Sequence, residues 1–359
     1  MTLESPSIAK KRGRKAGNGG VARAHTAKAP SIAKVAERAG VSIATVSRVI
    51  NGVPNKMSES TLLRVQDAIA ALNYRPMRAG TALRTKQTRL VALLIPDTSN
   101  AFYGAIAASV EKALSEERLT MILCNTNEDP DAQDEYLWEM RAHMVRGIAL
   151  FGAVASPALK EFVADDYPIV FVNRKPPPGL SGPFVGIDNR RAGREVAEHF
   201  LERGYTPCGV VHGPLSSSAS AERYEGFLGS LTAAGLTLGP EASAAGDLTL
   251  EAGYRGADAL LAANPRLRAI FCGNDLMAYG AYRLCCEKGL RVPEDIALFG
   301  FDDNPLNQWV APWLSTVRVP YESFGPAVRG LFDRLWLGDL VPSLSRIILP
   351  HELVLRASA

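Results

Sequence analysis

The stretch VAERAGVSIATVSRVING, residues 35–52, decides how the N-terminal part of the chain is organised. Its apolar residues recur at helical spacing, but the pattern breaks at Gly40 and restarts at Ser42. Glycine suits a backbone position with positive φ, and the small Ala36 lets two helices approach closely. We therefore expect two short helices joined by a tight turn, which is the helix-turn-helix arrangement.

Serines precede each of three helical segments between residues 31 and 73. A serine oxygen can accept a hydrogen bond from the free N–H groups of a first helical turn, so we expect Ser31, Ser42 and Ser58 as N-caps. One small apolar core is expected from Val35, Ala39, Val41, Val46, Ile50, Leu62, Val65, Ile69 and Leu72. An ordinary helical hairpin with exposed Ser and Thr is the alternative that spacing alone leaves open.

The second helix would enter the major groove of DNA. Its short hydroxyl donors suit phosphate oxygens, which set the register, and these are Ser42, Thr45 and Ser47. Arg48 can pair with a guanine edge or hold a phosphate, whereas Ile43 and Ala44 offer only apolar contact, for example to a thymine methyl. Asn51 and Arg78 complete the candidate DNA contacts from the helical region and the segment after it.

The charge of the chain is divided unevenly along its length. Residues 1–90 carry 17 Lys and Arg against four acidic residues, a formal charge of +13. The remaining 269 residues carry 23 basic and 33 acidic groups, a formal charge of −10. A basic head on an acidic body is expected when one end of a protein meets a polyanion. Residues 1–30 are basic and poor in apolar side chains, so we expect a disordered tail.

From residue 90 the pattern changes to short apolar strands that alternate with amphipathic helices. We expect strands at 91–96, 121–125, 147–152, 168–173, 208–213, 269–274 and 296–301. We expect helices near 101–117, 131–144, 190–203, 220–234, 251–263 and 275–288. Nearly continuous apolar strands between helices predict parallel sheets covered on both faces, here two sheets of about five or six strands each.

Polar side chains follow several of these strands, where ligands bind in open α/β sheets. They are Asp97, Asn125, Asn173, Arg174, Asn274, Asp275, Asp302 and Asp303. Taken singly, each is more often a loop-capping residue. Their recurrence after successive strands predicts a cleft with several hydrogen-bonding groups, which suits a polyol, a sugar or a sugar acid.

Several classes of protein are disfavoured by what the sequence lacks. The start of the chain has no apolar segment typical of a secretory signal, and no apolar run is long enough to span a membrane. The five cysteines show no C-x-x-C spacing, so we expect reduced thiols in a cytoplasm. The common catalytic and phosphate-binding motifs are missing, and we expect no catalytic residue, metal or cofactor.

Many ordered motifs together resemble the LacI/GalR family of bacterial repressors. They are the opening stretch, ALNYRP (71–76), LLIPDTSNAFY (93–103), VGIDN (185–189), HGPLSSSASAERYEGF (212–227), FCGNDLMAYGA (271–281), GLRVPEDIALFGFDD (289–303) and LSTVRVP (314–320). The resemblance covers about residues 31–357. It implies a helix-turn-helix head at 31–76, a hinge helix or linker at 77–89, and a two-lobed, periplasmic-binding-protein-like core at 90–359.

The resemblance also implies roles for single residues. Leu83 matches a leucine that family members push into the central base step of the operator from the minor groove, which bends the duplex. Effector-contacting positions of the family are matched by Phe102, Asn173, Arg174, Arg223, Asn274 and Asp302. Where sugar binders often carry an aromatic after a Gly-Asp turn, this chain has Leu248, which disfavours stacking on a sugar face. Two available arginines favour an acidic effector, either a sugar acid or a phosphorylated sugar.

We therefore expect a cytoplasmic, sequence-specific transcriptional regulator whose affinity for a palindromic operator is controlled by a small sugar-like or sugar-acid effector. The resemblance implies a homodimer and leaves a tetramer open. We expect no membrane among the partners of the chain. Repression is the expected action, and an activator or dual regulator is the alternative. An enzyme and a solute-binding transport protein are the rivals from other classes.

Overall fold

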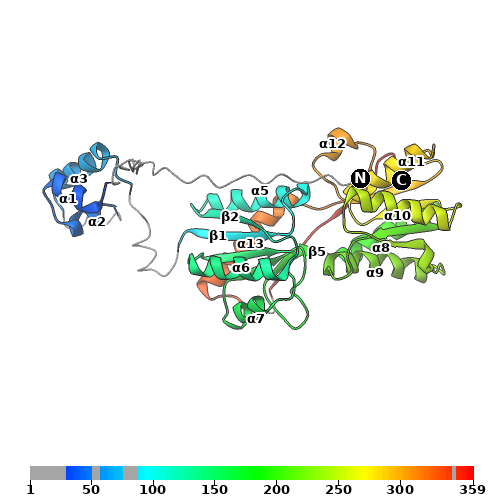
Figure 1. The fold of residues 1–359 in the computed structure, drawn as a ribbon, viewed down its shortest axis with the longest axis horizontal. Coiled ribbons are helices and arrows are strands. Elements are labelled where there is room, and N and C mark those ends of the chain that lie inside the picture. The colour runs from blue at the N-terminus through cyan, green and yellow to red at the C-terminus, as the bar shows by residue number, and fades with distance from the viewer. Residues whose placement is uncertain (1–29, 51–56, 76–87, 342–344) are drawn as a thin grey trace, which may run out of the picture. The chain divides into compact units, whose positions relative to one another are not determined.

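The computed structural model of the chain describes residues 30–50, 57–75, 88–341 and 345–359 (Figure 1). These residues belong to two compact units, Met1–Gly80 and Thr81–Ala359. The first is helical, and the second is built from alternating strands and helices.

The N-terminal unit contains helices α1 (Ile32–Ala39), α2 (Ile43–Ile50) and α3 (Glu59–Ala71). Each predicted N-cap is confirmed: the oxygens of Ser31, Ser42 and Ser58 accept from a backbone N–H three residues on, at 3.4, 3.2 and 3.3 Å. Gly40 ends α1 with φ 66° and donates its N–H back to the helix. That left-handed conformation favours glycine, so the break in the sequence pattern marks the turn between α1 and α2.

The three helices close on one small core. Its buried members are Val35, Ala36, Ala39, Val46, Val65 and Ala68, with Val41, Ile50, Ile69, Leu72 and others packed around them. The predicted core is therefore confirmed except for Leu62, which is not among its members, and several of the others are only half-buried. Small side chains at the centre allow the short helices to lie close together.

The second unit has two lobes, each built on a six-stranded sheet. The first sheet has the order β11-β5-β4-β3-β1-β2 and the second has the order β12-β10-β9-β8-β6-β7. All the described pairings are parallel except β12 on β10. The strands of the first sheet are β1 (Leu90–Ile95), β2 (Thr120–Asn125), β3 (Gly147–Phe151), β4 (Ile169–Val172), β5 (Phe184–Ile187) and β11 (Arg346–Leu349). Those of the second are β6 (Cys208–His212), β7 (Ser243–Ala245), β8 (Ala269–Cys272), β9 (Ala297–Asp302), β10 (Ser315–Arg318) and β12 (Glu352–Val354).

Helices cover both faces of each sheet, as Figure 1 shows. On the first sheet, α5 (Ala101–Ser115) and α13 (Tyr321–Leu337) pack on one face, and α6 (Pro130–Ala142) and α7 (Pro157–Ala164) pack on the other. On the second sheet, α8 (Asn189–Glu202) and α9 (Ser218–Ala233) face α10 (Leu250–Ala263) and α11 (Asp275–Glu287) across the strands. Burial on both faces explains why the central strands are apolar throughout.

The chain passes from one lobe to the other after β5, after β10 and after β11. The carboxyl ends of β1, β2 and β4 in one lobe, and of β8 and β9 in the other, carry the polar residues singled out from the sequence. In the first sheet, the direction in which successive strands are added reverses between β1 and β3. In the second sheet, it reverses between β6 and β8. Such reversal points are where ligands bind in open α/β sheets.

The sequence pattern missed several elements. One of them is helix α13, which carries Pro326 in its second turn, a residue that normally disrupts a helix. The carbonyl of Glu322 loses its helical partner there and instead accepts from the Ser109 hydroxyl at 3.0 Å, so packing on α5 compensates for the proline. The other missed elements, all eight residues or shorter, are α7, α12 (Asn307–Val310), β5, β7, β10, β11 and β12.

All five cysteines are free, and only Cys286 is exposed. Over the ranges given above, no helix is both long enough and apolar enough to cross a membrane.

Candidate functional site

Helix α2 exposes the side opposite its core residue, where the predicted DNA contacts lie. Val46 is buried, whereas Ile43, Ala44 and Arg48 are exposed. Residues three or four apart along a helix are neighbours, so Ile43 lies beside half-buried Ser47 and Ala44 lies beside Arg48. The face therefore combines one guanidinium, one hydroxyl and a small apolar surface.

Ser42 and Thr45 are engaged at the start of α2. The Ser42 oxygen accepts from the Thr45 backbone N–H at 3.2 Å, and the two hydroxyl oxygens lie 2.9 Å apart. Their first role is thus to cap the helix, and a contact with phosphate would add to that role. The other predicted DNA contacts, Asn51, Arg78 and Leu83, lie outside the described residues.

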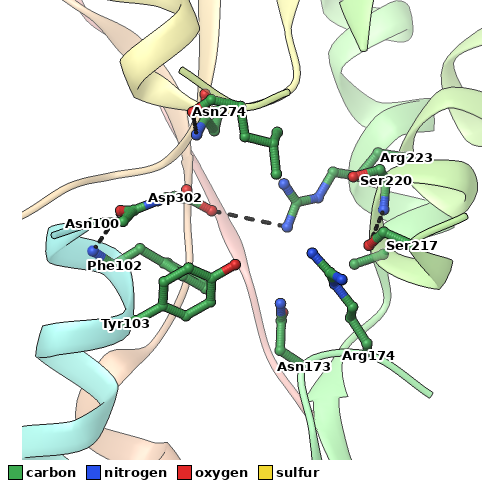
Figure 2. A pocket seen from close by; sticks show the side chains of 12 residues that line it. Asn100, Phe102, Tyr103, Asn173, Arg174, Ser217, Ser220, Arg223, Asn274 and Asp302 are labelled. Atoms are coloured by element: carbon green, nitrogen blue, oxygen red, sulfur yellow. Dashed lines mark hydrogen bonds and ion pairs between the residues drawn. The ribbon is translucent and has the colours of Figure 1, made fainter. Parts of the chain in front are cut away.

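The second candidate site is a cleft between the two lobes of the core (Figure 2). All six residues predicted to contact an effector line it: Phe102, Asn173, Arg174, Arg223, Asn274 and Asp302. It is also lined by Asn100, Tyr103, Ser217, Ala219, Ser220 and Leu248. Tyr103 and the serines escaped the sequence analysis because they lie within or just before helices rather than at strand ends.

Four of the predicted strand-end residues do not line the cleft. Asp97 accepts from Ser99, and Asn125 accepts from the Thr98 N–H at 2.8 Å, so both shape a loop. Asp275 and Asp303 belong to a hydrogen-bonded network behind the cleft. The prediction that these four side chains converge on the cleft was wrong.

Three residues of the cleft have backbone conformations that favour glycine. Asn173 has φ 64°, Leu248 has φ 68° and Asp302 has φ 108°. Such conformations cost about 1–3 kcal/mol each for other residues and concentrate at functional sites. The tertiary structure therefore holds these side chains in place against a local preference.

Arg223 is fixed by its own lobe. Its Nε donates to Asn189 Oδ1 and its Nη1 to the carbonyl of Gly273, both at 2.8 Å. The guanidinium lies 3.5 Å from the centre of the Phe301 ring, and its Nη2 is 3.9 Å from Asp302 Oδ1. One edge of the guanidinium therefore lacks a close partner within the described structure and points into the cleft (Figure 2).

Burial changes the acid–base properties of this pair. Loss of water raises the pKa of Asp302 well above its usual range, although the nearby Arg223 opposes that rise. Burial likewise lowers the pKa of Arg223, while Asp302 raises it. Asp302 can therefore bind a proton more readily than an exposed aspartate, and it can accept from or donate to a ligand hydroxyl.

The opposite lobe supplies a second cation. The Arg174 guanidinium is almost fully buried and lies 2.5 Å from Glu128 Oε1. Burial lowers the pKa of Arg174, but hydrogen bonds to Glu128 and Tyr103 outweigh burial and raise it. Beside it, Asn173 Oδ1 is buried with no hydrogen-bond partner in the described parts of the chain, and the Tyr103 hydroxyl points towards the centre of the cleft (Figure 2).

The cleft is nearly closed in this structure. The free space amounts to about 20 Å³, room for one or two water molecules. At the rim, the Lys175 ammonium pairs with Glu222 of α9, and the Lys175 N–H donates to Ser218 Oγ at 2.9 Å. Because Lys175 belongs to the first lobe and α9 to the second, these contacts join the lobes. A ligand larger than water requires the lobes to separate.

Two sequence families match the chain. Residues 31–77 match the bacterial regulatory proteins of the lacI family, and residues 197–359 match a periplasmic binding protein-like domain. The HTH-type transcriptional regulator DegA of Bacillus subtilis is 33% identical over 91% of this chain and 97% of its own. This chain belongs to the LacI family. It is a DNA-binding transcriptional regulator, with a helix-turn-helix head and a two-lobed core of parallel sheets.

Solved structures agree with this assignment of the LacI-family regulator. A lac repressor dimer bound to operator and an anti-inducer has a TM-score of 0.83 and 26% identity, covering 92% of this chain and 99% of its own. A CelR–cellobiose complex has a TM-score of 0.70 and 30% identity, covering 92% of this chain and 100% of its own. The relatives named here are regulators and not enzymes.

Proposed function

We propose that this LacI-family regulator acts in the cytoplasm as a repressor. It binds a palindromic operator as a homodimer, and an acidic, sugar-like effector in the cleft controls the binding. Ligand that binds between the lobes and alters their separation would change how the hinge segments of the two subunits meet, and so lower operator affinity. The alternative within the same class is an activator or dual regulator.

The DNA-binding part of the proposal is supported by α2. Arg48 and Ile43 stand on an exposed face with no acidic neighbour in the helix, and residues 1–90 carry a formal charge of +13. Phosphate contacts by such a head predict steep loss of affinity as salt rises. The lac repressor structure at 92% coverage is a dimer on its operator, which supports the same mode of binding.

The effector part is carried by one observation: Arg174 and Arg223 approach a single cleft from opposite lobes (Figure 2). Two guanidiniums can hold a carboxylate or phosphate with charge-assisted hydrogen bonds. Asn173, Asn274 and Asp302 then offer donors and acceptors for hydroxyl groups. The cellobiose complex of a 30% identical regulator supports a sugar-like framework, while Leu248 replaces aromatic stacking with an aliphatic contact.

A thermal-shift screen of the full chain tests the effector class. It compares gluconate and glucuronate with glucose, and glucose 6-phosphate with glucose, with purines as an unrelated class. An effector at one hundred times its Kd adds about 2.7 kcal/mol, which predicts a rise of about 5–10 °C in the melting temperature of a core this size. Stabilisation by neutral sugars alone would contradict the acidic effector.

Two variants of the cleft and surface arginines, and a measurement of DNA binding, complete the test of the proposed function. Arg174→Met is expected to abolish the shift caused by an acid, and the exposed Arg194→Met serves as a control. Operator DNA selected from a random pool should be palindromic, and the acid found in the screen should weaken its binding. Selection of an asymmetric sequence bound by a monomer would contradict the proposed mode of DNA binding.

A further inference from the structure

The guanidinium of Arg174 has a carboxylate partner that lies outside the cleft. Glu128 Oε1 is 2.5 Å from Arg174 Nη2, and Glu128 is not one of the described residues that line the cleft. The Arg174 side chain is 6% exposed, whereas the Glu128 side chain is 36% exposed. Glu128 therefore covers one edge of the guanidinium from the solvent side, and the rest of the guanidinium faces the cleft (Figure 2).

The loop after β2 is built to place Glu128 there. Asn127 and Glu128 have φ 54° and 58°, so two successive residues adopt the left-handed conformation and turn the chain sharply. The loop is attached to the end of β1, where the Asn127 N–H donates to the Pro96 carbonyl at 3.0 Å. The sheet therefore helps to set the position of the carboxylate, in addition to its attraction to Arg174.

Arg223, in the other lobe, also has one carboxylate partner. Asp302 Oδ1 lies 3.9 Å from Arg223 Nη2, and both side chains are almost fully buried. Among the described residues that line the cleft, the charged ones are Arg174, Arg223 and Asp302. Two guanidiniums are therefore matched by two carboxylates, and each lobe contributes one such pair.

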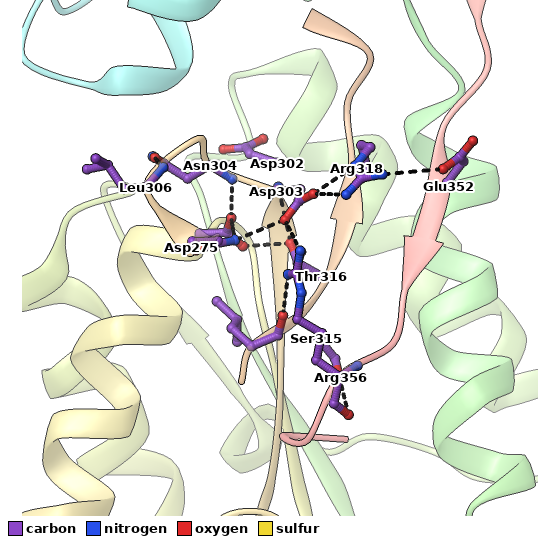
Figure 3. A network of polar contacts seen from close by, with 12 residues as sticks. Asp275, Asp302, Asp303, Asn304, Leu306, Ser315, Thr316, Arg318, Glu352 and Arg356 are labelled. Carbon is purple, nitrogen blue, oxygen red and sulfur yellow. Dashed lines mark hydrogen bonds and ion pairs between the residues drawn. The ribbon is translucent and has the colours of Figure 1, made fainter. Parts of the chain in front are cut away.

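The other acidic groups near Asp302 are satisfied inside the second lobe (Figure 3). Asp303 accepts from Arg318 and Arg356, each at 2.8 Å. Asp275 accepts from three uncharged donors at 2.6–2.8 Å, which are the Thr316 hydroxyl, the Asn304 N–H and the Asn307 amide. Neither carboxylate lines the cleft. A ligand in the cleft therefore meets chiefly the charges of the two arginines and of their two partners.

The charge of Glu128 acts inside the cleft as well as at its edge. Burial raises the pKa of Tyr103 to about 12, while the Arg174 charge opposes this rise and the Glu128 charge adds to it. The Tyr103 hydroxyl points towards the centre of the cleft (Figure 2). In a site shielded from water, a unit charge one guanidinium away changes the energy of an anion by more than the thermal energy.

We propose that Glu128 determines the charge class of the effector, because it offsets the charge of Arg174 and so favours a sugar acid with one negative charge over a doubly charged sugar phosphate. The inference rests on the acidic effector of the proposed function and narrows it. One anion between Arg174 and Arg223 completes a row of alternating charges from Glu128 to Asp302. A phosphate monoester carries about −1.5 to −2 at pH 7, and both carboxylates repel the additional charge. Glu128 acts through Arg174 and does not touch the effector.

Glu128→Gln tests this role, because the amide oxygen still accepts from Arg174 while the charge is removed. Titration calorimetry of the full chain compares glucose, glucuronate and glucose 6-phosphate at constant ionic strength. The variant should bind the two acids more tightly, by roughly fivefold for each negative charge, and should bind glucose as the wild type does. The preference for glucuronate over glucose 6-phosphate should therefore fall roughly fivefold.

Two small anions test the same prediction without a sugar framework. Formate carries one negative charge and sulfate carries two, and both accept hydrogen bonds from guanidinium groups. At constant ionic strength, the rise in melting temperature caused by sulfate should be larger in Glu128→Gln than in the wild type, and formate should show a smaller difference. Arg174→Met should abolish both differences, which identifies the cleft as the site of binding.

Two further variants separate the charge of Glu128 from its position. Glu135→Gln removes a charge from an exposed residue of α6 in the same lobe and should leave every affinity unchanged. Glu128→Asp keeps the charge on a shorter side chain and should retain the preference for the singly charged acid.

The outcomes distinguish failure of the selectivity from failure of the proposed function. If Glu128→Gln strengthens both acids by the same factor, or weakens them, the role of Glu128 is overturned and the acidic effector stands. A wild-type chain that prefers glucose 6-phosphate to glucuronate overturns it likewise. If none of the anions binds to the wild type or to the variant, the acidic effector itself is contradicted, and the selectivity with it.

Discussion

Arg223 stacks on Phe301 and donates to Asn189 and Gly273 from a fully buried position. Removing it leaves these acceptors and the Asp302 carboxylate without their cation, so Arg223→Ala should lower the free energy of unfolding by about 2–4 kcal/mol. Arg190→Ala, at an exposed ion pair with Glu225, should change it by less than about 0.5 kcal/mol. Urea denaturation measures both, and equal losses would mean that burial of Arg223 is not what stabilises the lobe.

Arg48 is the exposed cation of α2 and the best candidate for reading a base. Arg48→Ala should weaken operator binding by about 1–3 kcal/mol and leave effector binding intact. Arg38→Ala is the matched control, because it removes the same charge from an exposed position on α1. Its expected loss of operator-binding free energy is below about 0.5 kcal/mol. Fluorescence anisotropy with the selected operator measures both variants, and a change in effector affinity for Arg48→Ala would count against separate sites.

Ser42, the residue that precedes helix α2, is expected to serve two different purposes. Ser42→Ala removes the cap and should destabilise the helix by about 1 kcal/mol, seen as faster amide exchange in residues 43–50. Ser42→Asp keeps a capping oxygen, so exchange should stay slow, but its negative charge would repel a DNA phosphate. Operator binding that survives Ser42→Asp unchanged would show that Ser42 acts only as a cap.

Helix α13 shows how an element can depend on its neighbour. Pro326 removes one helical hydrogen bond, and Ser109 of α5 replaces it at the Glu322 carbonyl. Gly325 lets the two helices approach, since a Cβ there would lie 2.1 Å from the Ser109 carbonyl oxygen. The local sequence gives no sign of this compensation, because the hydroxyl that supplies it is more than two hundred residues away.

The pH dependence of the whole molecule follows from its buried carboxylates. Burial raises the pKa of Asp275 to about 7, against the lowering effect of its three donors. The folded chain then binds this proton more tightly than the unfolded chain, so its contribution to stability falls as pH rises from about 4 to about 7. The free energy of unfolding of the wild type, relative to Asp275→Asn, should fall by about 2–4 kcal/mol over that range.

Urea denaturation of the wild type and Asp275→Asn between about pH 5 and 7.5 measures that difference. Asp295→Asn is the control, because hydrogen bonds from Arg291 lower the pKa of Asp295 and its contribution is lost only below this range. A difference between wild type and Asp275→Asn that does not change with pH would contradict the buried, titrating carboxylate.

The sequence was sufficient for the order of the elements and for much of the site. Caps such as Ser31 and the turn at Gly40 are local, because each depends on residues within one helical turn. Alternation of apolar strands and helices predicted two parallel sheets, and the ordered motifs picked out six residues that line one cleft. These features depend on local backbone preference and burial, which are visible in the order of residues.

Only the tertiary structure separated cleft residues from loop-shaping ones. Asp97 and Asp302 both follow apolar strands, yet Asp97 caps its own loop, whereas Asp302 is turned into the cleft by a backbone at φ 108°. The proton affinity of Asp275 and the exposure of Trp309 were equally hidden in the sequence. Desolvation, strain and pairing depend on groups far apart in the chain, so folding alone decides which polar residue binds a ligand and which supports the fold.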